Sequence, residues 1–339
     1  MELFSLGGGE RRLTVELGGL HHVTAVTADA PGNVGFYTNE LGLRLVKKTV
    51  NQDDVSAYHL FYGDEVGNPG SELTFFDWAW AGTQPEGSGM ISEIGLRVPD
   101  SAALDWWAER LDSRGVSHED VENGDGGATL RFTDPEGQRL ALVHDERDGM
   151  TGGAPWDRSP VPQEKGIRGL DSVTLNLGRL DPTATVLTKA LGFRAAGEGT
   201  LDGHRTATYE VGPGGPGARV RLVERPDLPP HRRNGAGGVH HVAFRTPDEE
   251  EHAAWREHLA RIGLGVTPVI DRHYFKALYF REPGGVLFEI STDGPGFATD
   301  EDPASLGEKL SLPPFLEDRR EEIEAGLQPL PTAGAGVSR

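Results

Sequence analysis

The chain contains no cysteine among its 339 residues, which excludes disulfide bonds, thiolate metal ligands and cysteine nucleophiles. It also lacks any long run of apolar residues, so we expect no transmembrane helix. The first residues, MELFSLGGGERRLTVEL, lack the basic start and apolar core of a signal peptide. Together these absences predict a cytoplasmic protein.

Lysine is scarce. Only six of the 33 basic residues are lysines, 53 residues are acidic, and the formal net charge is −20. This charge disfavours nucleic acids and anionic membranes as partners, because phosphate groups would be repelled. Many acids with few lysines are typical of proteins that stay soluble in very high salt, so we expect a halophilic protein. The alternative is a high-GC genome that favours arginine codons.

One segment of the sequence occurs twice. GGLHHVTAVTAD, from Gly18 to Asp29, returns as GGVHHVAFRTPD, from Gly237 to Asp248. Each copy opens a unit in which an alternating strand leads to a helix and then to further strands. Each helix starts after Asp or Asp-Pro and ends at a glycine, which are typical start and stop signals. Four such units cover residues 19–78, 89–145, 166–225 and 237–293.

These units predict an α+β fold, in which four βαβββ units form two curved, cup-like sheets, followed by a short helix at 316–325. The expected domain organisation is an N-terminal extension (1–16), an N-terminal half with two units (17–147), a Gly- and Pro-rich linker (148–165), a C-terminal half with two units (166–295) and a C-terminal helix and tail (296–339). The last eight residues, TAGAGVSR, are expected to be disordered.

Two histidines and one glutamate have the pattern of a metal site. His22 and His241 are the second histidines of the two doublets, and Glu289 lies in the apolar strand GGVLFEIST. A carboxylate in such a strand is costly unless it is paired or binds a metal. Two imidazoles and one carboxylate are the ligand set of non-haem Fe(II) sites that activate oxygen.

The middle units serve as an internal control. They carry Ser92-Glu93 and Asp171-Ser172 where the outer units carry histidines, and Ala141 and Leu222 where the last unit carries Glu289. Only the first and last units therefore supply a full ligand set. We expect these two to pair around one metal, while the middle two form a metal-free partner.

The repeated units with His, His and Glu resemble the vicinal oxygen chelate superfamily. Further blocks, LGLRLVKKTVNQDD, YHLFYGDEVGNPGSELTFF, DRHYFKALYFREPGGVLFEI and LGEKLSLPP, resemble the ring-cleaving hydroquinone dioxygenases over about residues 18 to 327. The resemblance implies vicinal oxygen chelate modules with His22, His241 and Glu289 as metal ligands. It also implies that five further residues line the active site, namely His21, Thr24, His240, Arg272 and Tyr279.

The implied function is that of an Fe(II)-dependent, extradiol-type ring-cleaving dioxygenase in aromatic-compound breakdown, with Mn(II) as the alternative ion. Its partners would be a small aromatic substrate of the hydroquinone class, O2, and further copies of the chain in a homo-oligomer. His240 would be the acid/base group that supplies a proton when the O–O bond breaks. Arg272 and Tyr279 would hold a phenolate, although both also suit an ordinary edge strand.

Two other functions remain open. One is a glyoxalase- or epimerase-like lyase or isomerase that uses its metal as a Lewis acid, and the other is a resistance protein that binds an aromatic compound without turnover. Strict strand alternation points His21 and His240 away from the ligand face, so their entry into the pocket requires a twist or a bulge. The remaining histidines are expected to be structural or on the surface: His59, His144, His204, His231, His252, His258 and His273.

Overall fold

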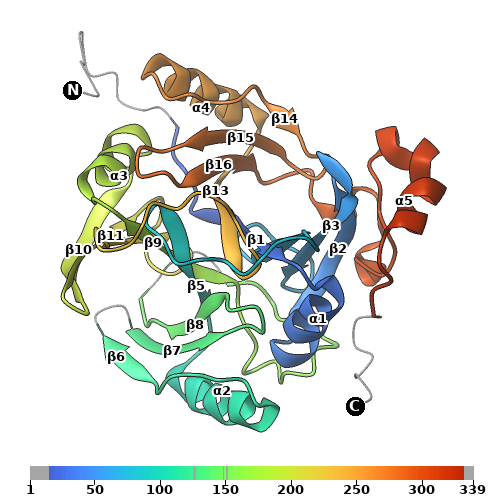
Figure 1. Cartoon of the computed structure of the whole chain (residues 1–339), viewed down its shortest axis with the longest axis horizontal. Helices are drawn as coiled ribbons and strands as arrows, with labels where there is room; N and C mark the ends of the chain where they lie inside the picture. Colours follow the sequence, from blue (N-terminus) through green and yellow to red (C-terminus); the bar gives the residue numbers. More distant parts are fainter. Residues whose placement is uncertain (1–14, 125–126, 148, 150–151, 332–339) are drawn as a thin grey trace.

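The computed structural model describes residues 15–124, 127–147, 149 and 152–331. Two eight-stranded sheets make up most of this part of the chain, and the longer helices lie on their outer sides (Figure 1). No helix in these ranges is long and apolar enough to cross a membrane. The expected α+β fold of two curved sheets is confirmed.

The first sheet joins the first and last units of the chain. Its strand order is β14-β15-β16-β13-β1-β4-β3-β2, and the two units meet where β1 pairs antiparallel with β13. The expected pairing of these two units is therefore confirmed. The strands are β1 (Leu20–Thr27), β2 (Arg44–Asn51), β3 (Asp54–Gly63), β4 (Glu72–Asp77), β13 (Gly238–Thr246), β14 (Ile270–Asp271), β15 (Lys276–Arg281) and β16 (Leu287–Thr292).

The second sheet joins the two middle units in the same manner, in the order β10-β11-β12-β9-β5-β8-β7-β6. Its strands are β5 (Met90–Arg97), β6 (Glu122–Gly124), β7 (Gly127–Thr133), β8 (Arg139–His144), β9 (Leu170–Leu177), β10 (Arg194–Leu201), β11 (His204–Glu210) and β12 (Arg219–Glu224). Each sequence half thus contributes one unit to each sheet. The βαβββ pattern predicts three strands after each helix, but the sequence does not mark where three of the edge strands, β6, β10 and β14, lie.

Two of the unit helices are regular and start at aspartate caps. In α2 (Ser101–Arg114) the Asp100 carboxylate accepts the Ala103 N–H, and in α4 (Glu249–Arg261) Asp248 accepts that of Glu251. The other two change to π-helix after their first turns, which the sequence does not predict. They are α1 (Ala30–Gly35) with η1 (Phe36–Glu40), and α3 (Asp181–Thr185) with η2 (Val186–Ala190).

The C-terminal segment runs along β2 and β3 of the first sheet (Figure 1). The helix expected at 316–325 is a 3-10 turn, η5 (Pro314–Arg319), that continues into α5 (Arg320–Gly326). Two shorter 3-10 turns precede it, η3 (Phe297–Thr299) and η4 (Pro303–Ser305). The expected disorder of TAGAGVSR concerns residues outside the described ranges.

Candidate metal centre

Three ligand atoms from the first sheet converge at one buried point. The Nε2 atoms of His22 and His241 lie 3.3 Å apart, and Oε2 of Glu289 lies 3.4 Å from the first and 2.8 Å from the second. The three residues are at most 2% exposed. Strands β1, β13 and β16 are neighbours in the sheet, so residues 267 positions apart in the chain can meet here.

The spacing of these atoms fits a single metal ion. Ligand atoms that bind one ion at about 2.1 Å and at right angles lie about 3 Å apart. Oε2 of Glu289 is buried and accepts no hydrogen bond among the described residues, whereas Oε1 accepts one from Ser291 Oγ at 2.6 Å. Burial by itself raises the pKa of Glu289, but His22 and His241 outweigh burial and hold the pKa well below its ordinary value. An ionised carboxylate facing two imidazole nitrogens is suited to a divalent cation.

A β-bulge at each doublet decides where its first histidine points. Across the β1–β13 pairing, Leu20 faces Phe244 and His22 faces Ala243, so His21 is an extra residue on β1. The register shifts again after Thr24, which leaves His240 as the extra residue on β13. A bulge of this kind redirects a side chain that strict alternation would send to the other face. Both first histidines therefore contact the ligand histidines that follow them.

The contacts of His21 determine which nitrogen of His22 is free for the metal. His21 Nε2 lies 3.1 Å from the carbonyl oxygen of Thr292, which can only accept a hydrogen bond, so Nε2 carries the proton of the neutral ring. Its Nδ1 then accepts from Nδ1–H of His22, 3.0 Å away. His22 Nε2 is consequently unprotonated and presents its lone pair to the ligand triangle.

Glu72 is a buried acid beside this pair that the sequence does not single out. It is the first residue of β4, and its Oε2 lies 3.5 Å from Nδ1 of His21 and has no hydrogen bond among the described residues. Burial lowers the pKa of His21, but Glu72, with smaller contributions from Asp293 and Glu289, outweighs burial, so the pKa lies above its ordinary value. His21, His22 and Glu72 form a second group whose ligand atoms lie within 4.8 Å of one another.

His240 is placed differently from His21. Its Nδ1 lies 2.7 Å from Nδ1 of His241, and its ring lines a neighbouring cavity. Neither His21 nor His240 lines the pocket at the ligand triangle, contrary to the expectation from the sequence. Burial, helped by His241 and two arginines, lowers the pKa of His240 to about 3. The ring is therefore neutral near pH 7.

A small pocket of about 30 Å³ lies against the ligand triangle. Both expected substrate contacts, Arg272 and Tyr279, line it. The Arg272 guanidinium lies 5.5 Å from the centre of the Tyr279 ring and pairs with Asp53 at 3.0 Å. Burial, followed by Glu289, raises the pKa of Tyr279, so its phenol keeps its proton. The apolar walls of the pocket are Phe61, Phe76 and Phe275.

His59 also lines this pocket and is not an ordinary structural or surface histidine. Its Nε2 lies 3.0 Å from Oγ1 of Thr74, which lies 2.7 Å from Oγ1 of Thr24. Burial, then His22 and His241, lowers the pKa of His59 well below its ordinary value. The expected site residue Thr24 thus reaches the pocket through Thr74 and His59. The sequence signal for His59 was its place in the same alternating strand as Phe61, which faces the pocket.

The second sheet has the same bulges but no ligand set. Its register shifts leave Ser92 and Asp171 as the extra residues between β5 and β9. Glu93, which matches His241, pairs with Arg131 at 3.1 Å. The residue that matches Glu289 in the third unit is Arg221, not the expected Leu222, because Thr174 faces Arg221 as Ala243 faces Glu289. An arginine there disfavours a cation even more strongly than a leucine would.

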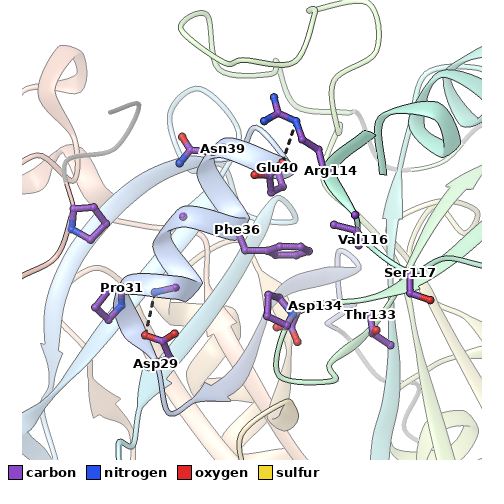
Figure 2. A pocket seen from close by; sticks show the side chains of 15 residues that line it. Asp29, Pro31, Phe36, Asn39, Glu40, Arg114, Val116, Ser117, Thr133 and Asp134 are labelled. Carbon is purple, nitrogen blue, oxygen red and sulfur yellow. Dashed lines mark hydrogen bonds and ion pairs between the residues drawn. The ribbon is translucent and has the colours of Figure 1, made fainter. Parts of the chain in front are cut away.

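A much larger cavity lies elsewhere. It measures about 790 Å³ and is bounded by α1, η1, the end of α2 and the end of β7. Figure 2 shows the Phe36 ring pointing into it, with Val116 across from it and the Arg114–Glu40 ion pair at its rim. None of the ligand residues lines this cavity. Size alone therefore does not locate the chemistry of this molecule.

Known proteins match this chain over most of its length. The family model of the Glyoxalase/Bleomycin resistance protein/Dioxygenase superfamily matches residues 19–142 and 169–290. MhqA of Bacillus subtilis (strain 168), provisionally named a ring-cleaving dioxygenase, is 50% identical over 317 residues, which are 93% of this chain and 100% of that protein. The chlorohydroquinone/hydroquinone 1,2-dioxygenase of Sphingobium indicum is 36% identical over 312 residues, 90% of this chain and 94% of that protein.

A crystal structure from Bacillus subtilis subsp. subtilis str. 168, provisionally titled a dioxygenase, superposes with a TM-score of 0.85 at 39% identity. The match covers 94% of this chain and 99% of that one.

Proposed function

Because this chain belongs to the Glyoxalase/Bleomycin resistance protein/Dioxygenase superfamily, we propose that it is a metal-dependent dioxygenase that cleaves the ring of a hydroquinone-type substrate. The observation that carries the proposal is the buried triangle of His22, His241 and Glu289 at the end of an aromatic pocket. The names of the relatives support the reaction class.

We infer that the ion is Fe(II), with Mn(II) as the alternative, because the same three ligands suit both ions. Three protein ligands leave positions open for a substrate hydroxyl and for O2. Bound there, Fe(II) would lower the pKa of the ligated hydroxyl and transfer electron density to O2. The chain itself orients the ligands, since Nδ1 of each ligand histidine is held by the histidine before it.

The pocket walls supply substrate binding and orientation. Phe61, Phe76 and Phe275 exclude water from a planar ring. The Tyr279 phenol, protonated at neutral pH, would donate a hydrogen bond to a ring oxygen, and the Arg272 guanidinium would stabilise its negative charge. Both side chains line the pocket at the ligand triangle. Tyr279 lies directly opposite Glu289 in the pairing of β15 with β16.

We propose His240 as the acid/base group, provided that its ring can turn toward the substrate. Its Nδ1 is engaged by His241, so only Nε2 is available to give or take a proton. Nε2 serves the reaction only if the ring turns toward the substrate. In the orientation described here, the role that the contacts support is to hold His241 in its ligating tautomer.

One observation disfavours the glyoxalase-like alternative. Such enzymes usually use a second carboxylate from the matching strand of the partner unit. In this sheet that position is Thr74, which faces Thr24 as Glu289 faces Ala243. A pure binding protein, in turn, needs no convergent triad of buried ligands. A dioxygenase accounts both for the buried triad and for a threonine in place of a second carboxylate.

The test is the stoichiometry of oxygen uptake by the Fe(II)-loaded protein with methylhydroquinone. We expect one mole of O2 per mole of hydroquinone and a ring-opened product heavier by two oxygen atoms. Oxygen uptake that yields only the benzoquinone would mean simple oxidation and would overturn the proposal. Tight binding of the hydroquinone without oxygen uptake would instead support a binding protein.

A further inference from the structure

A cavity of about 410 Å³ is lined by His240 but by none of the three proposed ligand residues. Three arginines line it: Arg232 and Arg233 come from the segment before β13, and Arg281 from the end of β15. None of the three forms an ion pair with a carboxylate within residues 15–331 as far as they are described. Glu86 of the facing loop pairs instead with Arg139 and Arg225.

Arg232 and Arg233 have neither an acidic nor a carbonyl partner among the described residues, and Arg281 donates only to the carbonyl oxygen of Gly285. Such arginines are unusual for this chain, because its acidic residues outnumber its basic ones by 20 and most other arginines of the described ranges have acidic or carbonyl partners. Guanidinium groups are donors only. Three of them around a cavity create a local positive potential within an acidic surface, which favours an anionic ligand.

His240 adds a fourth donor to the same cavity. If His241 presents the lone pair of Nε2 to a metal, its Nδ1 carries the proton and donates to Nδ1 of His240, 2.7 Å away. The proton of the neutral His240 ring must then be on Nε2. This nitrogen has no partner among the described residues, and the ring lines the arginine cavity. A single imidazole thus connects the ligand triangle with a cavity whose charged groups are all donors.

We propose that this cavity is a carboxylate-binding site, and that its ligand is the carboxylate produced by ring cleavage. The identity of the ligand rests on the proposed function. Breaking the carbon–carbon bond beside a hydroxyl of a hydroquinone inserts both atoms of O2, the four-electron oxidant. The hydroxyl-bearing carbon becomes a carboxylic acid, its neighbour becomes an aldehyde, and the acid loses its proton to water. A neutral substrate is thereby converted into an anion.

The rest of the molecule does not attract such a product. At a net charge of −20 the surface potential repels carboxylates, whereas neutral hydroquinones are unaffected. The arginine cavity is therefore a place where the product binds and the substrate does not. Guanidinium groups match the planar geometry of a carboxylate through paired hydrogen bonds.

The experiment is calorimetric titration of the Fe(II)-loaded enzyme with cis,cis-muconate, a six-carbon dicarboxylate that resembles an opened ring. We expect binding to wild type and about ten-fold weaker binding to the Arg232→Gln/Arg233→Gln variant, the typical loss for one hydrogen bond to a charged group. Arg281→Gln should weaken binding to a similar extent. The control is Arg179→Gln/Arg256→Gln, which removes two exposed arginines elsewhere and should leave the Kd within about two-fold.

Three outcomes would overturn the proposal. One is no binding of muconate to wild type, and another is equal weakening in the control variant. The third is inorganic phosphate binding as tightly as muconate, because the cavity would then be a general anion site. Since the titration requires no turnover, its result is independent of whether the chain proves to be a ring-cleaving dioxygenase.

Discussion

At the scale of single residues, the two histidines of each doublet have different roles. The second histidine of each doublet points its Nε2 at the ligand triangle, and the first holds the other nitrogen of that ring. A single histidine without its neighbour could rotate or change tautomer, and either change would remove the lone pair from the metal site. The repeated doublet is therefore a device for fixing two ligands.

Tyr279→Phe should lower hydroquinone turnover while the metal content stays unchanged. Removing one buried hydrogen bond to a charged oxygen costs about 1.5 to 3 kcal/mol, which corresponds to roughly ten- to hundred-fold in rate. The measurement is kcat/KM from initial oxygen uptake, with iron content determined in parallel. Tyr209→Phe, in the second sheet, is the matched control. Equal rates for wild type and Tyr279→Phe would remove this phenol from substrate binding.

Glu72→Gln should weaken metal binding although Glu72 is not one of the proposed ligands. The carboxylate lies beside Nδ1 of His21, and partners at this distance from a metal typically change its affinity about 10- to 100-fold. Competition with a chelator measures the Kd for Fe(II) directly, without any assay of activity. Glu72→Asp, which keeps the charge, should recover part of the affinity. If Glu72→Gln binds iron as tightly as wild type, Glu72 does not position His21.

The three proposed ligand residues stand out in the sequence, but two of their buried neighbours, Glu72 and His59, do not. Glu289 is conspicuous because it lies among Leu287, Phe288 and Ile290, and the doublets are conspicuous because they repeat. Glu72 lies in a strand that also contains other polar residues, so nothing in the local pattern marks it, and His59 is marked only by sharing an alternating strand with Phe61. The parallel pairing of β1 with β4 sets Glu72 opposite His22, and the antiparallel pairing of β3 with β4 sets His59 opposite Phe76, which lines the same pocket.

At the scale of elements, the longest regular signals were predicted correctly, but three of the four edge strands were not. Helix α2 has an aspartate cap at its start, a glycine after its last residue and an apolar face, and these features predict both of its ends. Strand β10 has all eight residues exposed and consists largely of small and polar residues. It is held by main-chain hydrogen bonds to β11, and such bonds do not require alternating apolar and polar side chains.

The hairpin between β7 and β8 gives a prediction for pH. Burial raises the pKa of Asp134, which lies at its turn, to about 6, although Tyr37 and two backbone N–H groups partly oppose this. The folded state therefore keeps a proton that the unfolded chain has already released, and this contribution to stability is lost as the pH rises from about 4 to 6. It amounts to at most about 3 kcal/mol.

Urea unfolding of Asp134→Asn and wild type between pH 4 and 7 measures this effect. We expect the free energy of unfolding of the wild type to fall relative to the variant over this interval. Asp77, whose pKa burial also raises to about 6, is unchanged in both proteins and cancels in the difference. If the free energies of unfolding of the two proteins change in parallel with pH, the pKa of Asp134 is the same in the folded and the unfolded state.

At the scale of the whole molecule, the net charge of −20 predicts a dependence on salt. Repulsion among surface carboxylates destabilises the compact state, and at 1 M salt the Debye length shrinks to about 3 Å. Melting temperature and activity should therefore rise between about 0.1 M and multi-molar KCl. Scanning calorimetry across this range tests the expected halophilic adaptation. A flat response would favour arginine-rich codon usage as the origin of the composition.

The two sheets share strand order, bulges and connections, yet only the first brings a full ligand set together. This architecture could be anticipated because the four units resemble one another, while the loss of ligands from the middle units shows in the sequence itself. In the second sheet the Glu93–Arg131 ion pair occupies the place that matches the metal site. One chain is therefore expected to bind one ion.

The most direct test of this account is the iron content per chain after reconstitution with Fe(II), measured by atomic emission for wild type and two variants. We predict one iron in wild type, loss of iron in Glu289→Ala, and one iron in Glu93→Ala, which changes the matching cup of the other sheet. Circular dichroism should show all three folded. Stoichiometric iron with full turnover in Glu289→Ala, or loss of iron from Glu93→Ala alone, would contradict the assignment of the metal centre to the first and last units.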